Sequence, residues 1–376
     1  MLRRLIICLA VLWGVWAHAQ ELVVEPQYDN AGTFHDGLAP VQLNGLWGFI
    51  DAKGRMVVEP QYERVLSGSE GLRGVKFNED GINRWAFLDS KGQIIGDPNA
   101  RGLKRYKGGW AAYKYFDDLW YFIDTKGNRI SDMGWEDIGG WEPPFAAVKA
   151  GSQWGIAHIG DFGFANPVDD PAFFTEGEAI QSISGISEES FVVQTDRGVK
   201  LLQIGKLPYQ VAAAVIPIAA DNAFHRRIKP MVNGLAPIQM SDGQWAMLHK
   251  RTGSLVFKGR FDEIRSMQEG FAAVKLDGLW GYINRQGKMV VPPTYDRAFD
   301  FSGGYATVRS GNLRGFLKIE DDLSISEYIP LQFEDVFRFR DGLAPVKFNG
   351  KWGFISNGEE ARPKLKQSPV KALIPG

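Results

Sequence analysis

The sequence predicts an all-β protein built from about nine short antiparallel β units in tandem. The first observation is a repeated segment: "GLWGFIDAKGRMVVEPQYERV" begins at Gly45 and "GLWGYINRQGKMVVPPTYDRAF" begins at Gly278. The second is composition, because 44 glycines and 12 tryptophans in 376 residues are typical of β-repeat folds. The third is that no segment keeps the apolar period of a helix over several turns.

A short apolar segment marks each unit and sets the period. It reads "GLAPV" both at Gly37 and at Gly342, and steps of 34 to 46 residues separate successive copies. A degraded copy, "SFVVQ", begins at Ser190, which brings the number of units to nine. Periods of this length are typical of repeat folds, whose units bury their apolar faces against their neighbours. The clear copies begin at Gly37, Gly71, Gly109, Pro144, Gly234, Gly270, Gly304 and Gly342.

Each unit is consistent with four short strands joined by tight turns. In the first unit, residues 38–45 form a strand that ends in an Asn-Gly hairpin turn, and residues 46–51 form the returning strand. Residues 51–54, "DAKG", supply a second turn with an Asp cap and a Gly at positive φ. Residues 55–60 form a third strand that Pro60 ends or bends, and residues 61–68 hold a fourth strand leading into the next unit.

A tryptophan recurs in phase on the returning strand, and a small residue usually follows it. Gly inside a strand is favoured where something must approach the backbone closely. We expect an aromatic ring of an adjacent strand or unit to lie flat on the sheet there, while the tryptophan supplies buried area. The structural repeat positions are Trp47, Gly48, Trp85, Trp120, Trp154, Gly155, Trp245, Trp280, Gly281, Trp352 and Gly353.

The segment "GLWGFIDAKGRMVVEPQY" with its upstream "GLAPV" resembles the WG repeat, also called the KWG repeat, a bacterial tandem repeat. The resemblance covers residues 22–357. It is specific in units one, seven and nine and weak between His158 and Lys229. It implies a repetitive β structure, often in exported or multidomain proteins, and no general biochemical activity.

The two ends of the repeat array complement each other. The array begins at Leu22 with "LVVEPQY", the third strand of a unit, and its last clear element is "KWGFISNG", the second strand of a unit. In propellers such an offset lets the first strand complete the last blade, so a propeller-like ring is favoured. The alternatives are an open β superhelix, or two four-unit halves joined at residues 158–230.

The first twenty residues read as a secretory signal. Arg3 and Arg4 precede an apolar stretch, and a small-x-small site predicts cleavage near Ala19. Cleavage would remove Cys8, the only cysteine, and place the chain in the periplasm or outside the cell. The predicted organisation is a signal peptide at 1–19, repeats 1–4 at 20–157, a degenerate repeat or hinge at 158–230, repeats 6–9 at 231–358 and a C-terminal tail at 359–376.

Basic and acidic residues recur at two fixed positions of the unit. They form either a charged stripe for an extended anionic partner or a ladder of neutralising pairs, and their balance favours the ladder. A formal charge of −1 gives no electrostatic footprint for nucleic acid. We expect Lys76 and its equivalents to lie close to acidic residues. The basic position holds Lys76, Lys114, Lys149, Lys275, Arg309 and Lys347, and the acidic one Asp29, Glu63, Glu136, Asp262, Asp296 and Glu334.

The sequence predicts no catalytic, cofactor-binding or metal-binding residues, since no motif of known chemistry is present. Trp141 and Phe116, aromatic residues outside the repeat pattern, are the candidates for a partner-binding surface, against local loop packing. We therefore expect an exported non-enzymatic scaffold for a protein or an envelope glycan, without a transmembrane segment in the mature chain. The alternatives are an enzyme with a site in the divergent middle or a central channel, and a passive structural envelope protein.

Overall fold

A computed structural model describes residues 22–131, 133–151, 153–159, 163–165, 180–185, 190–195, 198–204, 213–215, 227–229, 234–240, 242–249 and 255–358. All regular elements in this part of the chain are β-strands. The expected signal peptide and C-terminal tail lie outside the described residues, as does much of 158–230. None of the described segments is a helix that could cross a membrane.

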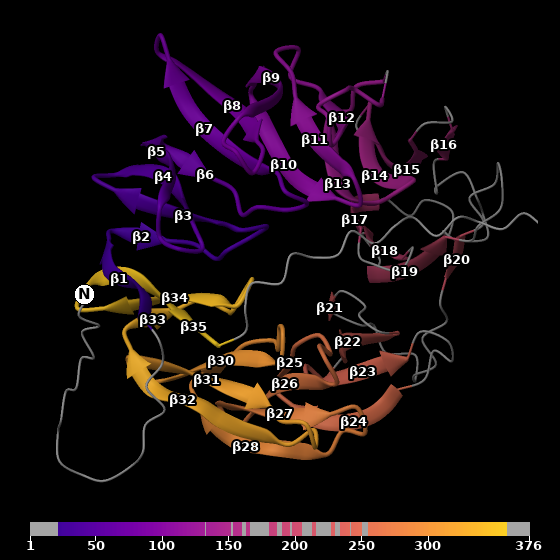
Figure 1. Cartoon of the computed structure of the whole chain (residues 1–376). Helices are drawn as coiled ribbons and strands as arrows, with labels where there is room; N and C mark the ends of the chain where they lie inside the picture. Colours follow the sequence, from indigo (N-terminus) through magenta and orange to yellow (C-terminus); the bar gives the residue numbers. More distant parts are fainter. Residues whose placement is uncertain are drawn as a thin grey trace, which may run out of the picture.

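The described strands form nine antiparallel sheets, here called blades, arranged in chain order around a ring (Figure 1). Blade 1 contains β2 (Asn30–Ala31), β3 (Leu38–Leu43), β4 (Leu46–Asp51) and β5 (Met56–Tyr62). Blade 2 contains β6 (Arg64–Val65), β7 (Arg73–Glu79), β8 (Ile82–Leu88) and β9 (Ile94–Ala100). Blade 3 contains β10 (Gly102–Lys107), β11 (Trp110–Lys114) and β12 (Trp120–Asp124).

The divergent middle of the chain also supplies blades, including one at the degraded copy. Blade 4 contains β13 (Asp137–Glu142), β14 (Phe145–Ala150), β15 (Gln153–His158) and β16 (Gly163–Ala165). Blade 5 contains β17 (Ile180–Gly185), β18 (Ser190–Thr195), β19 (Gly198–Ile204) and β20 (Ala213–Val215). Blade 6 contains β21 (Arg227–Ile228), β22 (Leu235–Gln239), β23 (Trp245–His249) and β24 (Leu255–Phe261).

The last three blades return to the starting point. Blade 7 contains β25 (Glu263–Ile264), β26 (Phe271–Leu276), β27 (Leu279–Asn284) and β28 (Met289–Tyr295). Blade 8 contains β29 (Arg297–Ala298), β30 (Tyr305–Ser310), β31 (Leu313–Ile319) and β32 (Ile325–Phe333). Blade 9 contains β33 (Asp335–Val336), β34 (Leu343–Phe348) and β35 (Lys351–Ser356), and β1 (Leu22–Tyr28) completes it.

Pairing of β1 with β35 joins the first strand to the last blade. The two strands are antiparallel, with Tyr28 opposite Trp352 and Val24 opposite Phe354. Lys351 Nζ lies 2.6 Å from Asp29 Oδ1, just beyond the end of β1. The propeller-like closure that the sequence favours is therefore confirmed at this junction, and an open superhelix is excluded there.

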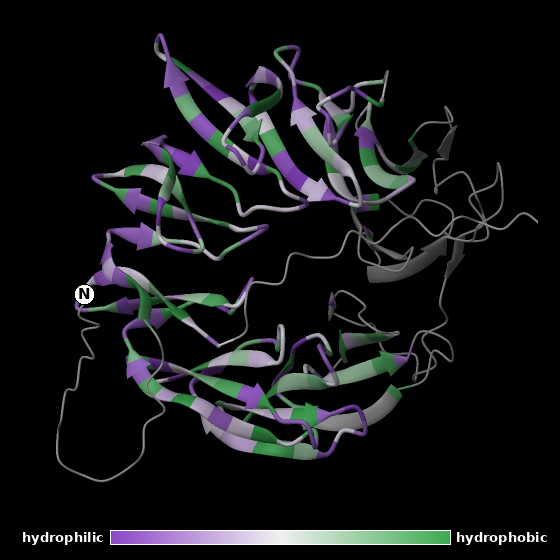
Figure 2. Ribbon diagram, in the orientation of Figure 1, coloured by the Kyte–Doolittle hydropathy of each residue, from purple (hydrophilic) through white to green (hydrophobic). Residues whose placement is uncertain are grey.

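The hydrophobic core lies between blades rather than inside any one of them. At the closing junction, Tyr28 and Phe354 of blade 9 pack with Phe34 and Val41 of blade 1. Blades 7 and 8 share another cluster that contains Trp280 and Phe301. Polar and apolar residues alternate along many of the strands, as expected when each face meets different surroundings (Figure 2). Each unit thus depends on its neighbours to bury apolar area.

The Trp-Gly pair accommodates a bulge in the next strand. On β4, two residues separate Trp47 from Phe49, but their partners on β5, Tyr62 and Val58, are four residues apart. A Cβ added to Gly48 would lie 2.4 Å from the Val58 carbonyl oxygen. Our expectation of an aromatic ring at this place is therefore wrong. The bulged backbone before the proline presses on the glycine, and only a residue without a side chain leaves it room.

Gly281→Ala is expected to lower the free energy of unfolding by about 2–3 kcal/mol, because its Cβ would meet a backbone oxygen that cannot swing away. The added atom would lie 2.3 Å from the Val291 carbonyl oxygen. Gly102→Ala is the matched control: its Cβ would lie 3.1 Å from a Trp120 ring atom, which a small shift relieves. Urea denaturation of both variants measures the difference, and equal losses would contradict the role of the bulge.

The acidic position of the repeat mostly caps hairpin turns. The Lys76 Nζ–Glu63 Oε2 distance is 3.1 Å, so the predicted pairing holds there. In other blades the carboxylate accepts a backbone N–H of the turn between the two central strands. Asp296 Oδ2 lies 2.6 Å from Gly311 N, and Asp29 Oδ2 lies 2.8 Å from Asn44 N. The acidic position therefore serves the fold mainly as a turn cap, and the expected pairing of the two positions is confirmed at Lys76 and Glu63.

Candidate functional site

Equivalent eight-residue segments begin with the first strand of a blade and end before its second strand. We call them rim segments: residues 30–37, 64–71, 102–109, 137–144, 263–270, 297–304 and 335–342. Because they are equivalent, position n of one segment can be compared with position n of another. Their alignment separates residues that hold the ring together from residues that the ring does not require.

The side chain at position 5 of the rim segment is usually buried in the core, and Trp141 occupies this position in blade 4. Trp141 is buried, its Nε1 donates a hydrogen bond to the Lys107 carbonyl, and its ring packs edge-on against Phe122. Our view that Trp141 has no equivalent in other units is wrong, because a buried apolar side chain occupies the same position in five other rim segments. Those residues are Phe34, Tyr106, Met267, Phe301 and Phe339.

In blades 1, 2, 7 and 9, position 7 carries a carboxylate that accepts hydrogen bonds from the next blade. Asp36 Oδ2 accepts a hydrogen bond from Gly71 N at 2.6 Å. Glu70 accepts from the amides of Gly108 and Gly109 at 2.6 and 2.8 Å. Asp341 Oδ2 lies 3.0 Å from Gly37 N, so the same contact crosses from blade 9 to blade 1.

Blade 7 repeats this contact with blade 8, where Glu269 accepts from Gly303 N and Gly304 N at 2.7 and 2.8 Å. Charge-assisted hydrogen bonds of this kind are stronger than neutral ones. Asp36, Glu269 and Asp341 each adopt a positive φ near 50°, which directs their carboxylates toward the next blade. These hydrogen bonds therefore join blade 9 to blade 1, blade 1 to blade 2, blade 2 to blade 3 and blade 7 to blade 8.

A buried arginine strengthens the contact between blades 1 and 2. Arg73 is 2% exposed, and its guanidinium donates to the backbone carbonyls of Gly71, His35 and Asp36. Burial lowers the pKa of Arg73, while Asp36 and Asp341 act in the opposite direction. The positive charge is thus held by carbonyl dipoles and nearby carboxylates inside the rim.

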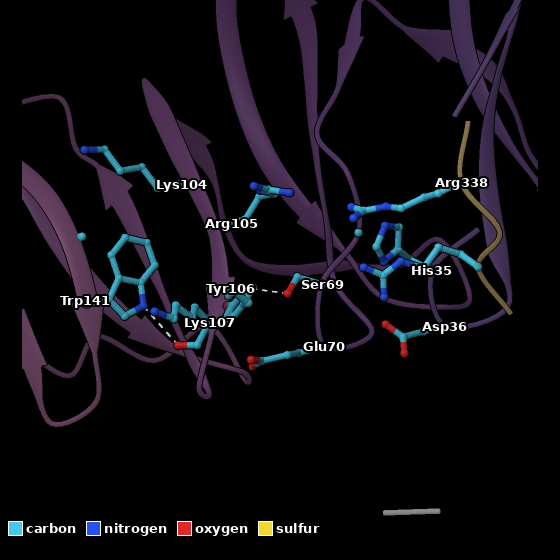
Figure 3. Close-up of a pocket in the computed structure, with 13 residues that line it drawn as sticks. His35, Asp36, Ser69, Glu70, Lys104, Arg105, Tyr106, Lys107, Trp141 and Arg338 are labelled. Carbon is cyan, nitrogen blue, oxygen red and sulfur yellow. Dashed lines mark hydrogen bonds between the residues drawn. The ribbon is translucent and has the colours of Figure 1, made fainter. Parts of the chain in front are cut away.

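The rim segments of blades 9, 1, 2, 3 and 4 enclose a cavity of about 670 Å³ (Figure 3). We call it the rim cavity. Its wall contains five lysine or arginine side chains, His35 and two carboxylates, those of Asp36 and Glu70. Figure 3 shows Arg105 and Arg338 reaching toward one another from opposite sides, with His35 beside Arg338. A volume of this size is within the range of small-molecule sites.

Burial and neighbouring arginines disfavour a further positive charge at the rim cavity. Burial, Arg340 and Arg338 lower the pKa of His35 to about 4, while Asp341 and Asp36 act in the opposite direction. Burial, together with Arg340 and Arg105, lowers the pKa of Arg338. Both directions show that an additional positive charge is disfavoured at this place.

His35 is expected to make the protein less stable as pH falls from about 6.5 to 4. Its folded pKa lies below its unfolded value, so in this window the unfolded state binds a proton and the folded state does not. The loss should amount to about 1–2 kcal/mol after allowance for partial exposure. Urea denaturation at several pH values should show a shallower slope for His35→Gln. His249→Gln in blade 6 is the control, and an unchanged slope in His35→Gln would contradict the assignment.

Ser69, which also lines the rim cavity, is not arranged as a nucleophile. Its Oγ donates a hydrogen bond to the Tyr106 carbonyl at 2.8 Å, a contact between blades 2 and 3. An activated serine instead gives its proton to a base. No group of three or more His, Cys, Asp or Glu side chains that could hold a metal ion is found in the described part of the chain.

Phe116, the second predicted site residue, lies in the β11–β12 turn and is 65% exposed. Its ring packs edge-on against Tyr115, and the nearby cavity of about 40 Å³ is lined by Tyr113, Tyr115 and Tyr121 among others. A cavity of that volume holds little more than one water molecule. Trp141 contacts the rim cavity instead, so the two predicted residues belong to different places.

The repeat tryptophans are structural platforms beside the rim. Trp245, Trp280 and Trp352 are buried, whereas Trp47, Trp85, Trp120 and Trp154 are half-buried. In several blades, the side chain at position 3 of the rim segment lies over the indole ring of a repeat tryptophan. The Lys104 ammonium lies 4.9 Å from the Trp120 ring, the Arg265 guanidinium 5.1 Å from the Trp280 ring, and Phe337 stacks on Trp352.

Sequence reasoning missed Arg105, Arg338 and Arg340 as site residues. They occupy positions 4 and 6 of their rim segments. Position 4 lies four residues, and position 6 two residues, before the glycine that begins the "GLAPV"-like segment. The signal was available, since Arg or Lys stands where other units have Thr33, Ser67, Ser69 or Ser302. It becomes informative only once the segments are known to converge.

Sequence comparison matches five segments of the chain to the WG containing repeat: residues 18–47, 47–79, 250–280, 280–313 and 328–352. The chain has no match among curated proteins. Solved structures with a similar arrangement include the computationally designed Ika8 protein, at 12% identity and TM-score 0.45, with 77% of this chain and 95% of that one covered.

Two natural proteins give similar values. BamB from Moraxella catarrhalis aligns at 10% identity and TM-score 0.41, with 77% of this chain and 91% of that one covered. The Cps50 (Swd1) β-propeller domain of Myceliophteria thermophila aligns at 11% identity and TM-score 0.35, with 68% and 96% covered. The five tandem matches, in phase with the blades, show that this chain contains WG repeats within a propeller-like, all-β architecture.

Proposed function

We propose that this WG repeat protein is an exported, non-enzymatic scaffold that binds a protein or an envelope glycan at its rim. The observation that carries the proposal is the convergence of five rim segments on one cavity, with carboxylate contacts that hold neighbouring blades in register. A fixed concave surface assembled from many repeats is the usual means by which repeat proteins bind partners. The positively charged n-region, apolar stretch and small-x-small site at residues 1–19 support export.

The arrangement of polar groups supports binding rather than catalysis. Ser69 and the carboxylates of Asp36 and Glu70 are engaged in backbone hydrogen bonds between blades. A catalytic nucleophile or base needs its lone pair or proton directed at a substrate. The polar residues at the rim cavity that could most readily do chemistry instead maintain the shape of the ring.

A site-specific protection assay tests the proposal. The chain from residue 20 onward contains no cysteine, so Ser67→Cys places a single thiol beside the rim cavity. Asn83→Cys, an exposed position on β8, is the matched control. Each protein is incubated with fractionated envelope extract, with purified peptidoglycan or with other purified envelope glycans, and the rate of thiol alkylation is measured.

A partner at the rim should slow alkylation of the Ser67→Cys protein at least fivefold and leave the Asn83→Cys protein unaffected. A protein fraction or a glycan that does this identifies the class of partner. Binding that protects neither thiol would contradict the assignment to the rim, and the absence of binding by every fraction would contradict the scaffold function. Turnover of a glycan during incubation would favour the enzyme alternative.

A further inference from the structure

We propose that the rim cavity binds a multiply charged oxyanion, a phosphate group or a cluster of carboxylates, between Arg105, Arg338 and Arg340. The inference rests on the proposed function, because it names the chemistry by which the rim would recognise its partner. The charged side chains at the cavity fall into two sets: those that make hydrogen bonds or ion pairs within the fold, and those that make none.

The two carboxylates of the cavity wall are used by the fold. Asp36 Oδ2 accepts a hydrogen bond from Gly71 N, and the Asp36 backbone carbonyl accepts one from the Arg73 guanidinium. Both oxygens of Glu70 accept backbone hydrogen bonds from blade 3. Both carboxylates are therefore engaged by backbone amides of the next blade, and Figure 3 shows the two side chains at the cavity wall.

Two of the five cations are used as well. Lys104 Nζ lies 3.2 Å from Asp137 Oδ1, donates to the Ile138 carbonyl and covers the Trp120 ring. Lys229 makes the same set of contacts in blade 6, with Glu263, the Ile264 carbonyl and Trp245, which shows that this arrangement belongs to the repeat. Lys107 also has a partner of its own.

The three arginines remain. Within the residues that the structure describes, the side chains of Arg105, Arg338 and Arg340 make neither an ion pair nor a hydrogen bond, and the buried Nε of Arg340 has no acceptor. Two of them, Arg105 and Arg338, are exposed to solvent and can be reached by a ligand. A guanidinium presents paired N–H donors that match the oxygens of phosphate or carboxylate.

The remaining charged groups near the arginines do not neutralise them. Asp300, in the blade 8 rim segment, interacts with Arg338 over a longer range, but burial raises its pKa and it also faces Arg265 and Lys229. His35 adds no charge at neutral pH, since its pKa is lowered to about 4. The carboxylates of Asp36, Glu70 and Asp341 also lie near, but each accepts backbone amide hydrogen bonds at a blade junction. Three guanidinium groups without a side-chain partner therefore remain to attract an anion.

The fold itself does not require these arginines. Arg105 and Arg338 occupy position 4, which holds Thr33 in blade 1 and Ser67 in blade 2. Arg340 occupies position 6, which holds Ser69 in blade 2 and Ser302 in blade 8. Blades with a small neutral residue at these positions form the same strands, so the charge concentrated at blades 9 and 3 serves something other than folding.

The test replaces each arginine by the residue that equivalent units carry. The Arg105→Ser, Arg338→Ser, Arg340→Ser triple variant is compared with the native chain and with a control of equal charge change, Arg64→Ser, Arg285→Ser, Arg297→Ser. The three control arginines are exposed and lie outside the cavity wall. Thermal unfolding first verifies that both triple variants fold, and calorimetric titration then measures binding of pyrophosphate and of citrate.

We expect the native chain and the control to bind one of these anions, and the cavity variant to bind it at least tenfold more weakly. Pyrophosphate binding would indicate a phosphate-bearing ligand, and citrate binding without pyrophosphate binding a carboxylate-bearing one. Equal affinity in all three proteins, or binding by none of them, would overturn the inference.

The inference and the proposed function can fail separately. If the native chain captures a partner at the rim but binds neither anion, the scaffold function stands and the oxyanion site is wrong. If the native chain binds an anion through the arginines but no envelope fraction slows alkylation of the Ser67→Cys protein, the oxyanion site stands and the scaffold function is wrong.

Discussion

Deletion of residues 22–28 is expected to lower the free energy of unfolding by about 5 kcal/mol or more, a large part of the stability of a typical domain. The deletion removes β1, and with it the buried side chains of Val24 and Tyr28. Burial of each such side chain stabilises by about 1.5–3 kcal/mol, and Trp352 and Phe354 of β35 would lose their packing partners. Urea denaturation followed by tryptophan fluorescence measures the loss.

Transfer of the same strand to the other end of the chain is the decisive control. Because β1 is the antiparallel neighbour of β35, "LVVEPQY" attached after residue 358 through a short Gly-rich turn can form the same sheet as a hairpin. We expect this variant to recover most of the lost stability. A transferred segment carrying Val24→Asp and Tyr28→Ser should not recover it. If the simple deletion left the unfolding midpoint unchanged, the ring closure would be wrong.

The closure could be predicted because it depends on which strands are missing at each end of the repeat array. The offset between "LVVEPQY" at Leu22 and "KWGFISNG" at Lys351 is visible without any side-chain geometry. The turns were predictable for a similar reason. Asn44 and Gly45 adopt the positive φ values that an Asn-Gly hairpin requires, and Asp51 Oδ1 caps the amides of Lys53 and Arg55.

The reason for glycine after tryptophan could not be predicted, because it depends on register. A small residue on β4 signals close approach, but the sequence does not say whether a ring or a backbone approaches. The two extra residues between Val58 and Tyr62 are recognisable as a bulge only when their partners on β4 are known. Ala86 lies opposite a longer bulge on β9, but Ala246 lies opposite a bulge of the same length as in blade 1, so bulge length alone does not select the residue.

The rim cavity was hidden for a different reason. Its residues lie in five units, and each one alone is an ordinary polar residue before a turn. Arg105 is more than two hundred residues from Arg338, and only closure of the ring brings blades 9 and 3 to one cavity. Trp141 was misjudged because Gly140 and the two prolines that follow it obscure the match between its rim segment and those of Phe34 and Phe339.

Substitution of Arg73 by methionine is expected to lower the free energy of unfolding by about 3–5 kcal/mol. Methionine matches much of the apolar volume but donates nothing, so the carbonyls of His35, Asp36 and Gly71 lose a donor inside the rim. Arg73 of blade 2 also donates hydrogen bonds to His35 and Asp36 of blade 1, so the loss of stability should extend beyond its own strand.

Arg64→Met on β6 of the same blade is the matched control, because Arg64 is exposed and its replacement should cost less than about 0.5 kcal/mol. Arg73→Lys separates charge from geometry: a lysine keeps the positive charge but cannot donate to three carbonyls from one planar group, so it should recover only a minor part. Native-state hydrogen exchange should show faster exchange at Gly71 and Gly37, whose amides bind the carboxylates of Asp36 and Asp341. Exchange that accelerates only within β7 would mean that Arg73 stabilises its own blade and not the ring.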